Sequence, residues 1–204
     1  MLLNNVGYEV TTYRIDGIYE DGRHPKGVTF TGDLHEDLKR RDFTINAMAY
    51  NDKDGLVDIF GGMDDLEEGV IRAVGVPEER FSEDALRMLR ALRFAAQLGF
   101  KIEENTRDAI VKLAPTLEKV SAERIQVELE KLICSDHPEL MREVYQCGLS
   151  KVFMPEWDVM MQTEQNSKHH MYNVGEHTIE AMKHVRADKV MRLAMLLHDV
   201  GKPG

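Results

Sequence analysis

The spacing of hydrophobic positions changes along the chain. In the first sixty residues the apolar side chains are largely β-branched or aromatic and stand in short runs between glycine-containing turns, a pattern typical of strands. From residue 82 onward the apolar positions recur three and four residues apart, which is the period of a helix that buries one face. The sequence therefore predicts an α+β protein, with a small β-containing part followed by an all-helical region.

The first sixty residues are expected to form a strand, a helix and turns. The segment 8–15 is dense in Val, Thr, Tyr and Ile and predicts a strand that ends at the turn Asp16-Gly17. Apolar positions between 34 and 50 predict a helix with an irregular start. The polar run 51–55 predicts a turn before the short apolar run at 56–60.

Residues 82–98 carry the clearest helical pattern. Ser82 is expected to be the N-cap, Glu83 and Asp84 would lie in the first turn, and Gly99 would end the helix. Further helices are predicted at 104–113, 121–135, 138–146, 175–186 and 189–198. Apart from a looser stretch at 153–168, the rest of the chain is therefore expected to be helical.

Composition excludes several classes of protein. Apolar residues make up 43% of the 204 residues and charged residues 30%, which is too apolar for a disordered chain. No apolar run approaches the roughly 20 residues of a membrane span, and the first residues lack a signal-peptide pattern, so we expect a cytoplasmic protein with no membrane partner. Cys134 and Cys147 lack the spacing of a disulfide framework or a zinc site and are expected to be core thiols.

The formal net charge of −10 argues against a protein that binds nucleic acid over its whole surface. It does not exclude RNA, because a local cluster of arginines can bind phosphates in an acidic chain. The distribution of the charges is therefore more informative than their sum, and two clusters stand out.

The first cluster, residues 39–48, contains Arg40, Arg41, Asp42 and Asn46. Two guanidiniums beside a carboxylate can pair a polyphosphate, while the carboxylate holds a metal or orients an arginine. A solvated basic turn before a helix explains the same residues, and on residue types alone it is the favoured interpretation.

The second cluster lies on the helix predicted at 82–98. Arg87, Arg90 and Arg93 recur every three residues and would form one ridge, with Asp84 one turn before Arg87. An adjacent carboxylate and guanidinium can offer an acceptor and a donor edge to a nucleobase, while the other arginines reach phosphates. The alternative is a surface ion pair with spare arginines, although three arginines in seven positions are unusual in a chain this acidic.

Four short motifs follow one another along the chain. They are Arg-Arg-Asp-Phe-Thr-Ile-Asn-Ala at 40–47, Asp-Ile-Phe-Gly-Gly at 58–62, Glu-Asp-Ala-Leu-Arg at 83–87, and Ser-Ala-Glu-Arg-Ile at 121–125 with Glu128. In this order they resemble the ribose- and triphosphate-contacting motif, the flexible head–neck motif, the nucleotide-templating motif and the neck motif of the class II tRNA nucleotidyltransferases. This is the family of bacterial CCA-adding enzymes and poly(A) polymerases, and the resemblance runs from about residue 8 to the end of the chain.

The resemblance implies a substrate class and a set of contacts. It implies transfer of CMP and AMP from CTP and ATP to the 3′ end of tRNA, with tRNA and the two nucleotides as partners. It further implies that Asp84 and Arg87 read the base, within a nucleotide-binding set of Arg41, Asn46, Asp84, Arg87, Arg90 and Arg93. CCA addition, addition of A or C alone and poly(A) synthesis share these residues and stay open, as does the oligomeric state.

The metal-binding motif of the family has no counterpart at its expected place. The family's palm opens with a glycine-rich turn and a D-x-D pair that holds two Mg²⁺ ions for attack of the RNA 3′-hydroxyl on the α-phosphate. The single D-x-D of this chain, at 52–54, follows the arginine motif and is expected to be a solvated turn. Asp42 and Glu9 remain as candidate catalytic carboxylates. The chain is expected to be a family member truncated at both ends, which binds nucleotide better than it turns it over.

Histidines near the C-terminus predict a second site. His177 on a predicted helix and the adjacent His198-Asp199 can place two imidazoles and a carboxylate on one divalent metal. This arrangement resembles the start of an HD phosphohydrolase domain, a module fused to some bacterial CCA-adding enzymes. HD domains draw a further aspartate from a later helix, which the chain does not reach, so the site would be incomplete. Helical histidines with ordinary polar partners are the alternative.

The resemblance divides the chain into three parts. These are the C-terminal part of a nucleotidyltransferase head, or palm, at 1–62, a helical neck with the templating and RNA-binding residues at 63–150, and the start of an HD domain at 151–204. The leading hypothesis is a tRNA 3′-end nucleotidyltransferase. An HD-type metal-dependent phosphohydrolase is the second hypothesis, and a non-catalytic nucleotide- or RNA-binding fragment is the third.

Overall fold

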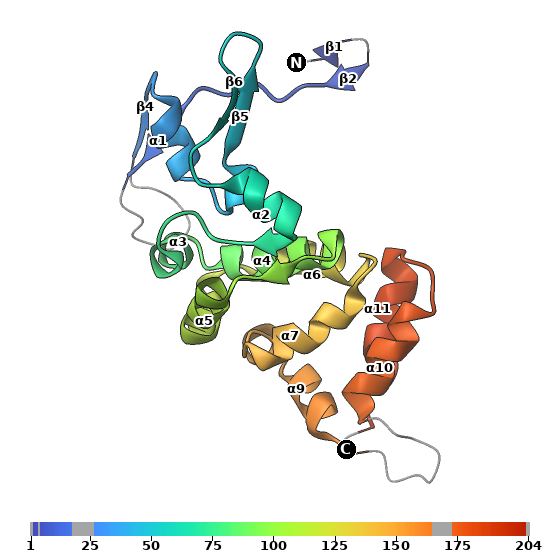
Figure 1. The fold of residues 1–204 in the computed structure, drawn as a ribbon. Helices are drawn as coiled ribbons and strands as arrows, with labels where there is room; N and C mark the ends of the chain where they lie inside the picture. Colours follow the sequence, from blue (N-terminus) through green and yellow to red (C-terminus); the bar gives the residue numbers. More distant parts are fainter. Residues whose placement is uncertain (1, 4, 18–26, 165–172, 203–204) are drawn as a thin grey trace.

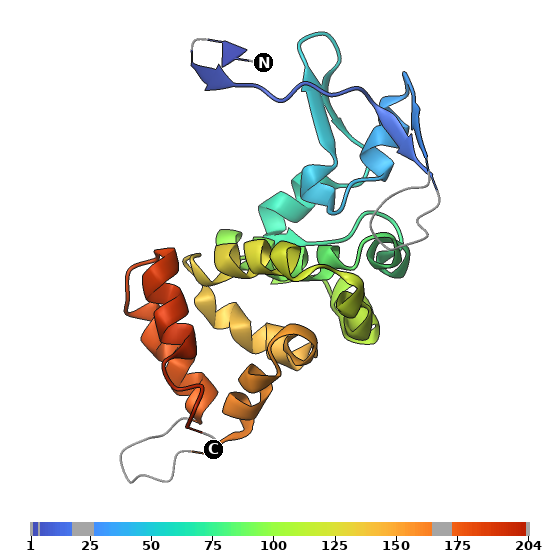
Figure 2. The same ribbon diagram turned by 180° about the vertical axis from the view of Figure 1, so that it is seen from behind.

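The computed structural model describes residues 2–3, 5–17, 27–164 and 173–202. The strand-rich N-terminal part lies at one end of the molecule and the later helices fill the other end (Figures 1 and 2). The predicted α+β class is therefore confirmed.

The strands form four separate two-stranded sheets. Three are antiparallel: β1 (Leu2–Leu3) with β2 (Val6–Gly7), β3 (Arg14–Asp16) with β4 (Val28–Phe30), and β5 (Met48–Asn51) with β6 (Gly55–Asp58). The fourth is parallel and joins β7 (Val70–Ile71) to β8 (Lys101–Ile102). Between the sheets lie α1 (Leu34–Lys39), a 3-10 helix (Thr44–Asn46) and α2 (Gly62–Glu68).

Two predictions for this part are wrong. The segment 8–13 is not a strand, and only the last two residues of the predicted strand enter β3. The helix predicted at 34–50 ends at Lys39, because residues 42–44 pair with the segment 72–74: Val74 donates to the carbonyl of Asp42, and Thr44 donates to the carbonyl of Arg72. This pairing over a long sequence distance overrides the local helical pattern.

The turn predicted at 51–55 is confirmed. The side-chain oxygen of Asn51 accepts from the N–H groups of Lys53 and Asp54, at 2.9 and 2.8 Å, and Gly55 has the positive φ that closes the β5–β6 hairpin. The D-x-D sequence at 52–54 is therefore a hairpin turn.

Helices make up most of the rest of the described chain. They are α3 (Pro77–Glu83), α4 (Leu86–Leu98), α5 (Glu104–Leu113), α6 (Ala122–Ile133), α7 (Met141–Gln146), α8 (Ser150–Phe153), α9 (Pro155–Gln162), α10 (Val174–Lys183) and α11 (Lys189–Leu197), with 3-10 helices at Ala114–Lys119 and Pro138–Leu140. The helix predicted at 104–113 is confirmed to the residue, and those predicted at 121–135, 138–146, 175–186 and 189–198 are confirmed with ends that shift by up to three residues.

The start of α4 differs from the prediction. Ser82 lies inside α3, which begins earlier because Pro77 occupies its first turn. Asp84 has an extended backbone, with φ −146° and ψ 103°, and separates α3 from α4. Gly99, with φ 69°, ends α4 as predicted.

One apolar core joins the helices. It is centred on the face of α4 that carries Met88, Leu89 and Leu92, and it continues through α6 to Trp157 and Leu196. Cys147 is buried in this core as predicted, whereas Cys134 is only half-buried. None of the described helices has the length and apolar character needed to cross a bilayer.

Candidate functional site

Both arginine clusters meet where α4 faces the segment between α1 and β5. Arg90 of α4 donates through Nε to Oδ2 of Asp42 at 2.9 Å, and a second guanidinium nitrogen reaches the same oxygen. Asn46 and the backbone N–H of Phe43 donate to the other oxygen, at 3.1 and 2.9 Å. The structure thus brings together Asp42, Asn46 and Arg90, although the aspartate and the arginine are 48 residues apart in the sequence.

The environment keeps Asp42 ionised. Burial raises the pKa of its carboxyl, but the charge of Arg90 and the hydrogen bonds from Arg90, Asn46 and Phe43 lower it by more, so the pKa lies below its usual value. Asp42 is therefore a hydrogen-bond acceptor that orients the Arg90 guanidinium.

Arg93 is not on the surface ridge that the spacing predicted. Its Nε donates to Oε2 of Glu128 on α6 at 2.8 Å, and both side chains are more than 90% buried. Its guanidinium also lies 3.5 Å from the ring centre of Phe94, a stacking contact, while Arg90 approaches the other oxygen of Glu128 at 3.7 Å. Glu128 therefore links Arg90 and Arg93, and the Arg90 guanidinium contacts both Glu128 and Asp42.

Arg87 pairs with Glu83 and not with Asp84. Its Nη1 donates to Oε2 of Glu83 and to the carbonyl of Arg80, and its Nη2 donates to the carbonyl of Arg40 at 3.2 Å. The expected carboxylate–guanidinium pair of Asp84 and Arg87 is not formed, because the break between α3 and α4 turns the Asp84 side chain elsewhere. Arg87 still lies against the first cluster.

Asp84 is fixed by the neck motif. Its Oδ1 accepts from the N–H of Leu86 at 3.2 Å, and its Oδ2 accepts from Nη2 of Arg124 on α6 at 2.7 Å. Both Asp84 and Arg124 are about a fifth exposed. Arg124 therefore holds the carboxylate that the family resemblance assigns to base reading.

Arg41 lies beside a buried acid on α1. Asp37 is 2% exposed and accepts from Arg41 at 3.1 Å, from Nε of Arg40 at 3.0 Å and from the backbone N–H of Arg14. Burial raises the pKa of Asp37, but these hydrogen bonds and the charge of Arg40 lower it by more. The Arg41 side chain stays 41% exposed, more than those of Arg87, Arg90 and Arg93.

The motif at 58–62 shapes the approach to this cluster. The Asp58 carboxylate accepts from the N–H groups of Gly62 and Met63, both at 2.8 Å, and so caps α2. An added Cβ on Gly62 would lie 2.3 Å from the carbonyl oxygen of Thr44, so only glycine fits there. This close contact sets α2 directly against residues 44–46.

The other candidate carboxylates do not form a metal site at this cluster. Glu9 lies in an exposed segment outside any strand, so the strand expected to carry it is absent. Within the described ranges, one group of three potential metal ligands lies close together. It consists of His177, His198 and Asp199, far along the chain from Asp42. Asp42 is engaged by Arg90 and Asn46. The described residues therefore do not fit a magnesium site beside the arginines.

The three C-terminal residues do come together, as their sequence predicted. Their ligand atoms lie within 4.8 Å of one another, with Oδ2 of Asp199 3.1 Å from Nε2 of His198 and 3.8 Å from Nε2 of His177. The Nδ1 atom of His198 lies 2.6 Å from the Met195 carbonyl, which orients the ring. Lys202 donates to the same aspartate oxygen at 2.7 Å, so an ammonium occupies that side of the carboxylate. His169 and His170, which follow a polar stretch of the sequence and could extend this site or form a surface pair, lie outside the described residues.

Sequence reasoning missed several partners in this arrangement. Spacing of four residues could have revealed the pair of Glu83 and Arg87, but nothing local indicates that Arg124 reaches Asp84. The burial of Glu128 also has a weak signal, namely an acid at an otherwise apolar position of α6.

Two protein families match the chain. The family described as "Poly A polymerase head domain" matches residues 1–72, and the family described as "Probable RNA and SrmB- binding site of polymerase A" matches residues 99–161. The first match contains Asp42 and the second contains Arg124 and Glu128. The arginines of α4 lie between the two matched segments, and their partners Asp42 and Glu128 lie inside them.

Curated relatives share more than half of the aligned residues. The CCA-adding enzymes of Leuconostoc mesenteroides subsp. mesenteroides and Lactiplantibacillus plantarum are each 56% identical, over 133 and 132 residues. These alignments cover 65% of this chain and 33% and 32% of the relatives. The chain thus spans about a third of the length of the curated relatives it matches.

Solved structures share the fold. The crystal structure of the Bacillus stearothermophilus CCA-adding enzyme in complex with CTP has a TM-score of 0.76 and 34% identity, and the match covers 97% of this chain and 45% of that one. The Thermotoga maritima CCA-adding enzyme complexed with tRNA-CCA has a TM-score of 0.56 and 29% identity, over 82% of this chain and 46% of that one.

Proposed function

We propose, from the premise that the chain belongs to the family of class II tRNA nucleotidyltransferases and poly(A) polymerases, that it selects CTP and ATP for addition of CMP and AMP to the 3′ end of tRNA. The observation that carries this proposal is the junction of the two arginine clusters, where Arg87 and Arg90 of α4 lie against residues 40–46. The related enzymes in complexes with CTP, ATP and tRNA support the choice of partners.

In this proposal the carboxylate–guanidinium contacts hold the nucleotide-binding side chains ready. Asp42 orients Arg90, and Arg41 remains the more exposed donor for phosphate oxygens. Asp84, held by Arg124, offers an acceptor to the base, and Arg87 offers donors once it turns from Glu83. Asn46 contributes by fixing Asp42. When the nucleotide binds, it replaces hydrogen bonds that these side chains make within the protein. It does not enter a site that already holds unpaired charges.

Arg93 has a different role from the one that the resemblance implies. Since it is buried against Glu128 and Phe94, it is assigned to positioning α4 against α6 rather than to nucleotide contact. This assignment predicts that Arg93 variants lose stability before they lose selectivity.

Mg²⁺ is part of the proposed reaction, because phosphoryl and nucleotidyl transfer depend on divalent ions that neutralise the developing charge. Among the described residues, no cluster of carboxylates beside the arginines supplies its ligands. Asp42 serves as the acceptor for Arg90 and not as a metal ligand.

The three-part division at 1–62, 63–150 and 151–204 remains part of the proposal. The first part would bind the triphosphate of the nucleotide, and the second would read its base and contact RNA. The third would be the start of the HD domain. A cytoplasmic location follows from the proposed tRNA partner.

Nucleotide titrations test this function. The protein is titrated calorimetrically with CTP, ATP, UTP and GTP, and the first two are expected to bind more tightly. Asp84→Ala and Arg87→Ala are each expected to weaken CTP binding by about tenfold or more, since each removes a charged hydrogen-bond partner. Arg186→Ala, which removes an exposed arginine from the segment between α10 and α11, is the matched control. Equal affinity for all four nucleotides, or no effect of either variant, would contradict the proposal.

A second function has one specific observation in its favour. The cluster of His177, His198 and Asp199 has the ligand types and proximity of a divalent metal site, provided that Lys202 leaves Asp199. Phosphatase activity that depends on Mn²⁺ or Ni²⁺ and is lost in His198→Ala is the expected result. Activity that survives this variant would exclude the site.

A further inference from the structure

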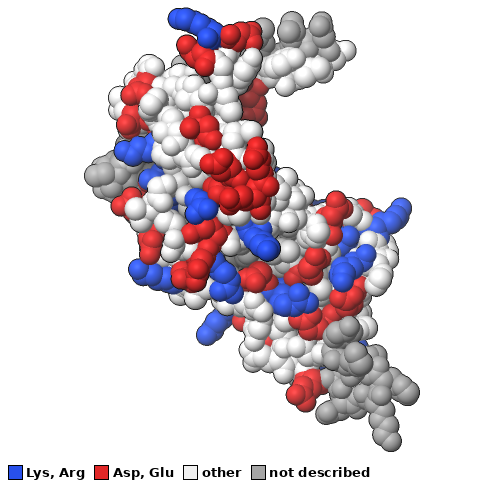
Figure 3. Space-filling view, viewed as in Figure 1, with Lys and Arg blue, Asp and Glu red and all other residues white. Residues whose placement is uncertain are grey.

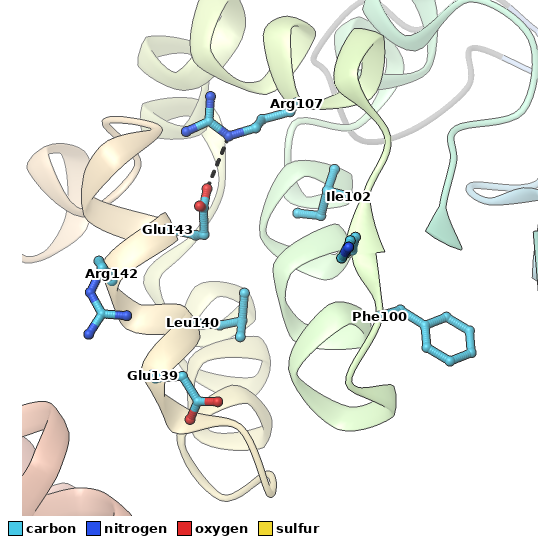
Figure 4. Close-up of a pocket in the computed structure, with 8 residues that line it drawn as sticks. Phe100, Ile102, Arg107, Glu139, Leu140, Arg142 and Glu143 are labelled. Carbon is cyan, nitrogen blue, oxygen red and sulfur yellow. Dashed lines mark hydrogen bonds and ion pairs between the residues drawn. The ribbon is translucent and has the colours of Figure 1, made fainter. Parts of the chain in front are cut away.

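A hollow separate from the arginine cluster lies between four elements in the C-terminal two-thirds of the chain. It has a volume of about 380 Å³ and is bounded on one side by β8 and α5 and on the other by Pro138–Leu140 and α7 (Figure 4). Volumes of about 300–1,000 Å³ are usual for pockets that hold small ligands. None of its lining residues belongs to the nucleotide-binding set.

The walls of the hollow combine apolar and polar groups. Ile102 and Leu140 point toward each other across it and supply apolar surface (Figure 4). Lys101 and Arg107 bring cations from β8 and α5, and Glu139 brings a carboxylate from the facing side. Groups that could bind a base, a ribose and a phosphate therefore surround one space.

Several polar atoms of the hollow are available to a ligand. Arg107 donates through Nε to Glu143 at 3.1 Å, and its two terminal nitrogens have no hydrogen-bond partner among the described residues. Oε2 of Glu139 is buried without a partner, although its Oε1 lies 3.0 Å from Nδ1 of His137. An unpaired buried acceptor is costly, so a donor from a ligand would be stabilising at this position.

The remaining cation of the lining is already neutralised. Arg142 makes two contacts with Glu176 through Nε and Nη2, and in Figure 4 its guanidinium is turned away from Ile102 and Leu140. Because Glu143 also balances Arg107, the hollow is not a simple basic patch. Binding there would depend on directed hydrogen bonds and apolar contact more than on net charge.

We infer that this hollow binds one nucleotide unit. Its base or ribose would lie between Ile102 and Leu140, its phosphate would meet Lys101 and Arg107, and an amino or hydroxyl group would donate to Glu139. An unpaired nucleotide of an RNA strand is the favoured source, because the whole lining falls within residues 99–161, the segment that matches an RNA-binding family description. The inference thus rests in part on the proposed function and adds a second contact point for its RNA partner.

Methyl NMR on the full chain tests the inference directly. The probes are a tRNA transcript without its terminal CCA and, separately, CMP and AMP. We expect the methyl signals of Ile102 and Leu140 to shift, while those of Ile125 and Leu129 stay in place. The last two line another hollow, of about 480 Å³, and so report on non-specific binding.

Charge variants give the second measurement. Lys101→Met and Arg107→Met are each expected to weaken binding of the transcript several-fold, and Glu139→Gln is expected to change the preference among bases. Lys112→Met is the matched control, because it removes an exposed cation from α5, the helix that carries Arg107, outside the hollow. The thermal transition of each variant shows that it is folded.

The outcomes separate the two proposals. Shifts with the transcript alone support an RNA nucleotide, and shifts with CMP or AMP support a free nucleotide in the same hollow. No shift with any probe, or equal weakening by Lys112→Met, would overturn the inference. If Asp84→Ala left the affinity for CTP unchanged while the methyl signal of Ile102 still shifted with the transcript, the proposed function would be contradicted. The inference about the hollow would then still be supported.

Discussion

At the scale of residues, each arginine of α4 meets a carboxylate from another element. Arg87 pairs with Glu83 of α3, Arg90 with Asp42, and Arg93 with Glu128 of α6. The spacing of the arginines could be predicted from the sequence, but their partners could not, since two of the three contacts cross 35 and 48 residues. The space-filling view likewise shows blue and red side chains interspersed over the helical part (Figure 3).

Removing the buried acid of this arrangement is expected to destabilise the protein. Glu128→Ala leaves the buried Arg93 guanidinium without its carboxylate, and breaking such a pair costs about 3–5 kcal/mol. Urea unfolding followed by circular dichroism measures the change. Glu130→Ala on the same helix removes a partly exposed carboxylate that pairs with the exposed Lys189 and should leave the midpoint nearly unchanged. Equal loss in both variants would contradict the buried role of Glu128.

Stability should depend on acid pH through Asp42. Because its pKa in the folded protein lies below the unfolded value, its contribution is present above about pH 4 and is lost as the pH falls through the folded pKa. Asp37, Asp58 and Glu103 have lowered pKa values as well, so the wild type should lose stability as these carboxylates are protonated. Asp42→Asn should show a smaller loss between about pH 6 and about pH 3. Unfolding midpoints across this range check the sign, and an unchanged slope would refute it.

At the scale of elements, the sequence predicted helices well and the strand-rich part poorly. The helix at 104–113 has regular apolar spacing and forms as predicted. Residues 40–50 have similar spacing, but their backbone pairs with 72–74 and continues into a hairpin. Local periodicity cannot report such pairing, because the partner lies far along the chain. The extended Asp84 is another example, since its partner Arg124 is on α6.

The contact between α2 and residues 44–46 gives a prediction for one glycine. Gly62→Ala places a methyl group against the Thr44 carbonyl, so α2 must move, at a cost of about 1–3 kcal/mol. Gly32→Ala meets no atom within 4 Å and serves as the control. Thermal unfolding should show a lower midpoint for the first variant only. A midpoint equal to that of Gly32→Ala would show that α2 does not depend on this contact.

At the scale of the whole molecule, the candidate site lies at the N-terminal edge of the core. The buried apolar cluster begins at Phe43 and extends to Leu196, whereas before Phe43 only Leu38 is a buried apolar residue in the described part of the chain. Tyr8, Val10 and Phe30 are exposed instead. The arginines of α4 stand at the boundary between these two regions. A site at such a boundary can respond to the movement of one region against the other.

The central claim is that a nucleotide binds at this boundary through Arg87 and Arg90. The most direct measurement is a CTP titration followed by the NMR signals of the arginine guanidinium N–H groups, because Arg87 pairs with Glu83 through Nη1 and Arg90 pairs with Asp42 through Nε and Nη2. We predict that the signals of Arg87 and Arg90 shift and saturate together, while that of Arg72, which pairs with Asp65, stays unchanged. Signals of Arg87 and Arg90 that do not move at saturating CTP, or an equal shift of Arg72, would contradict the account.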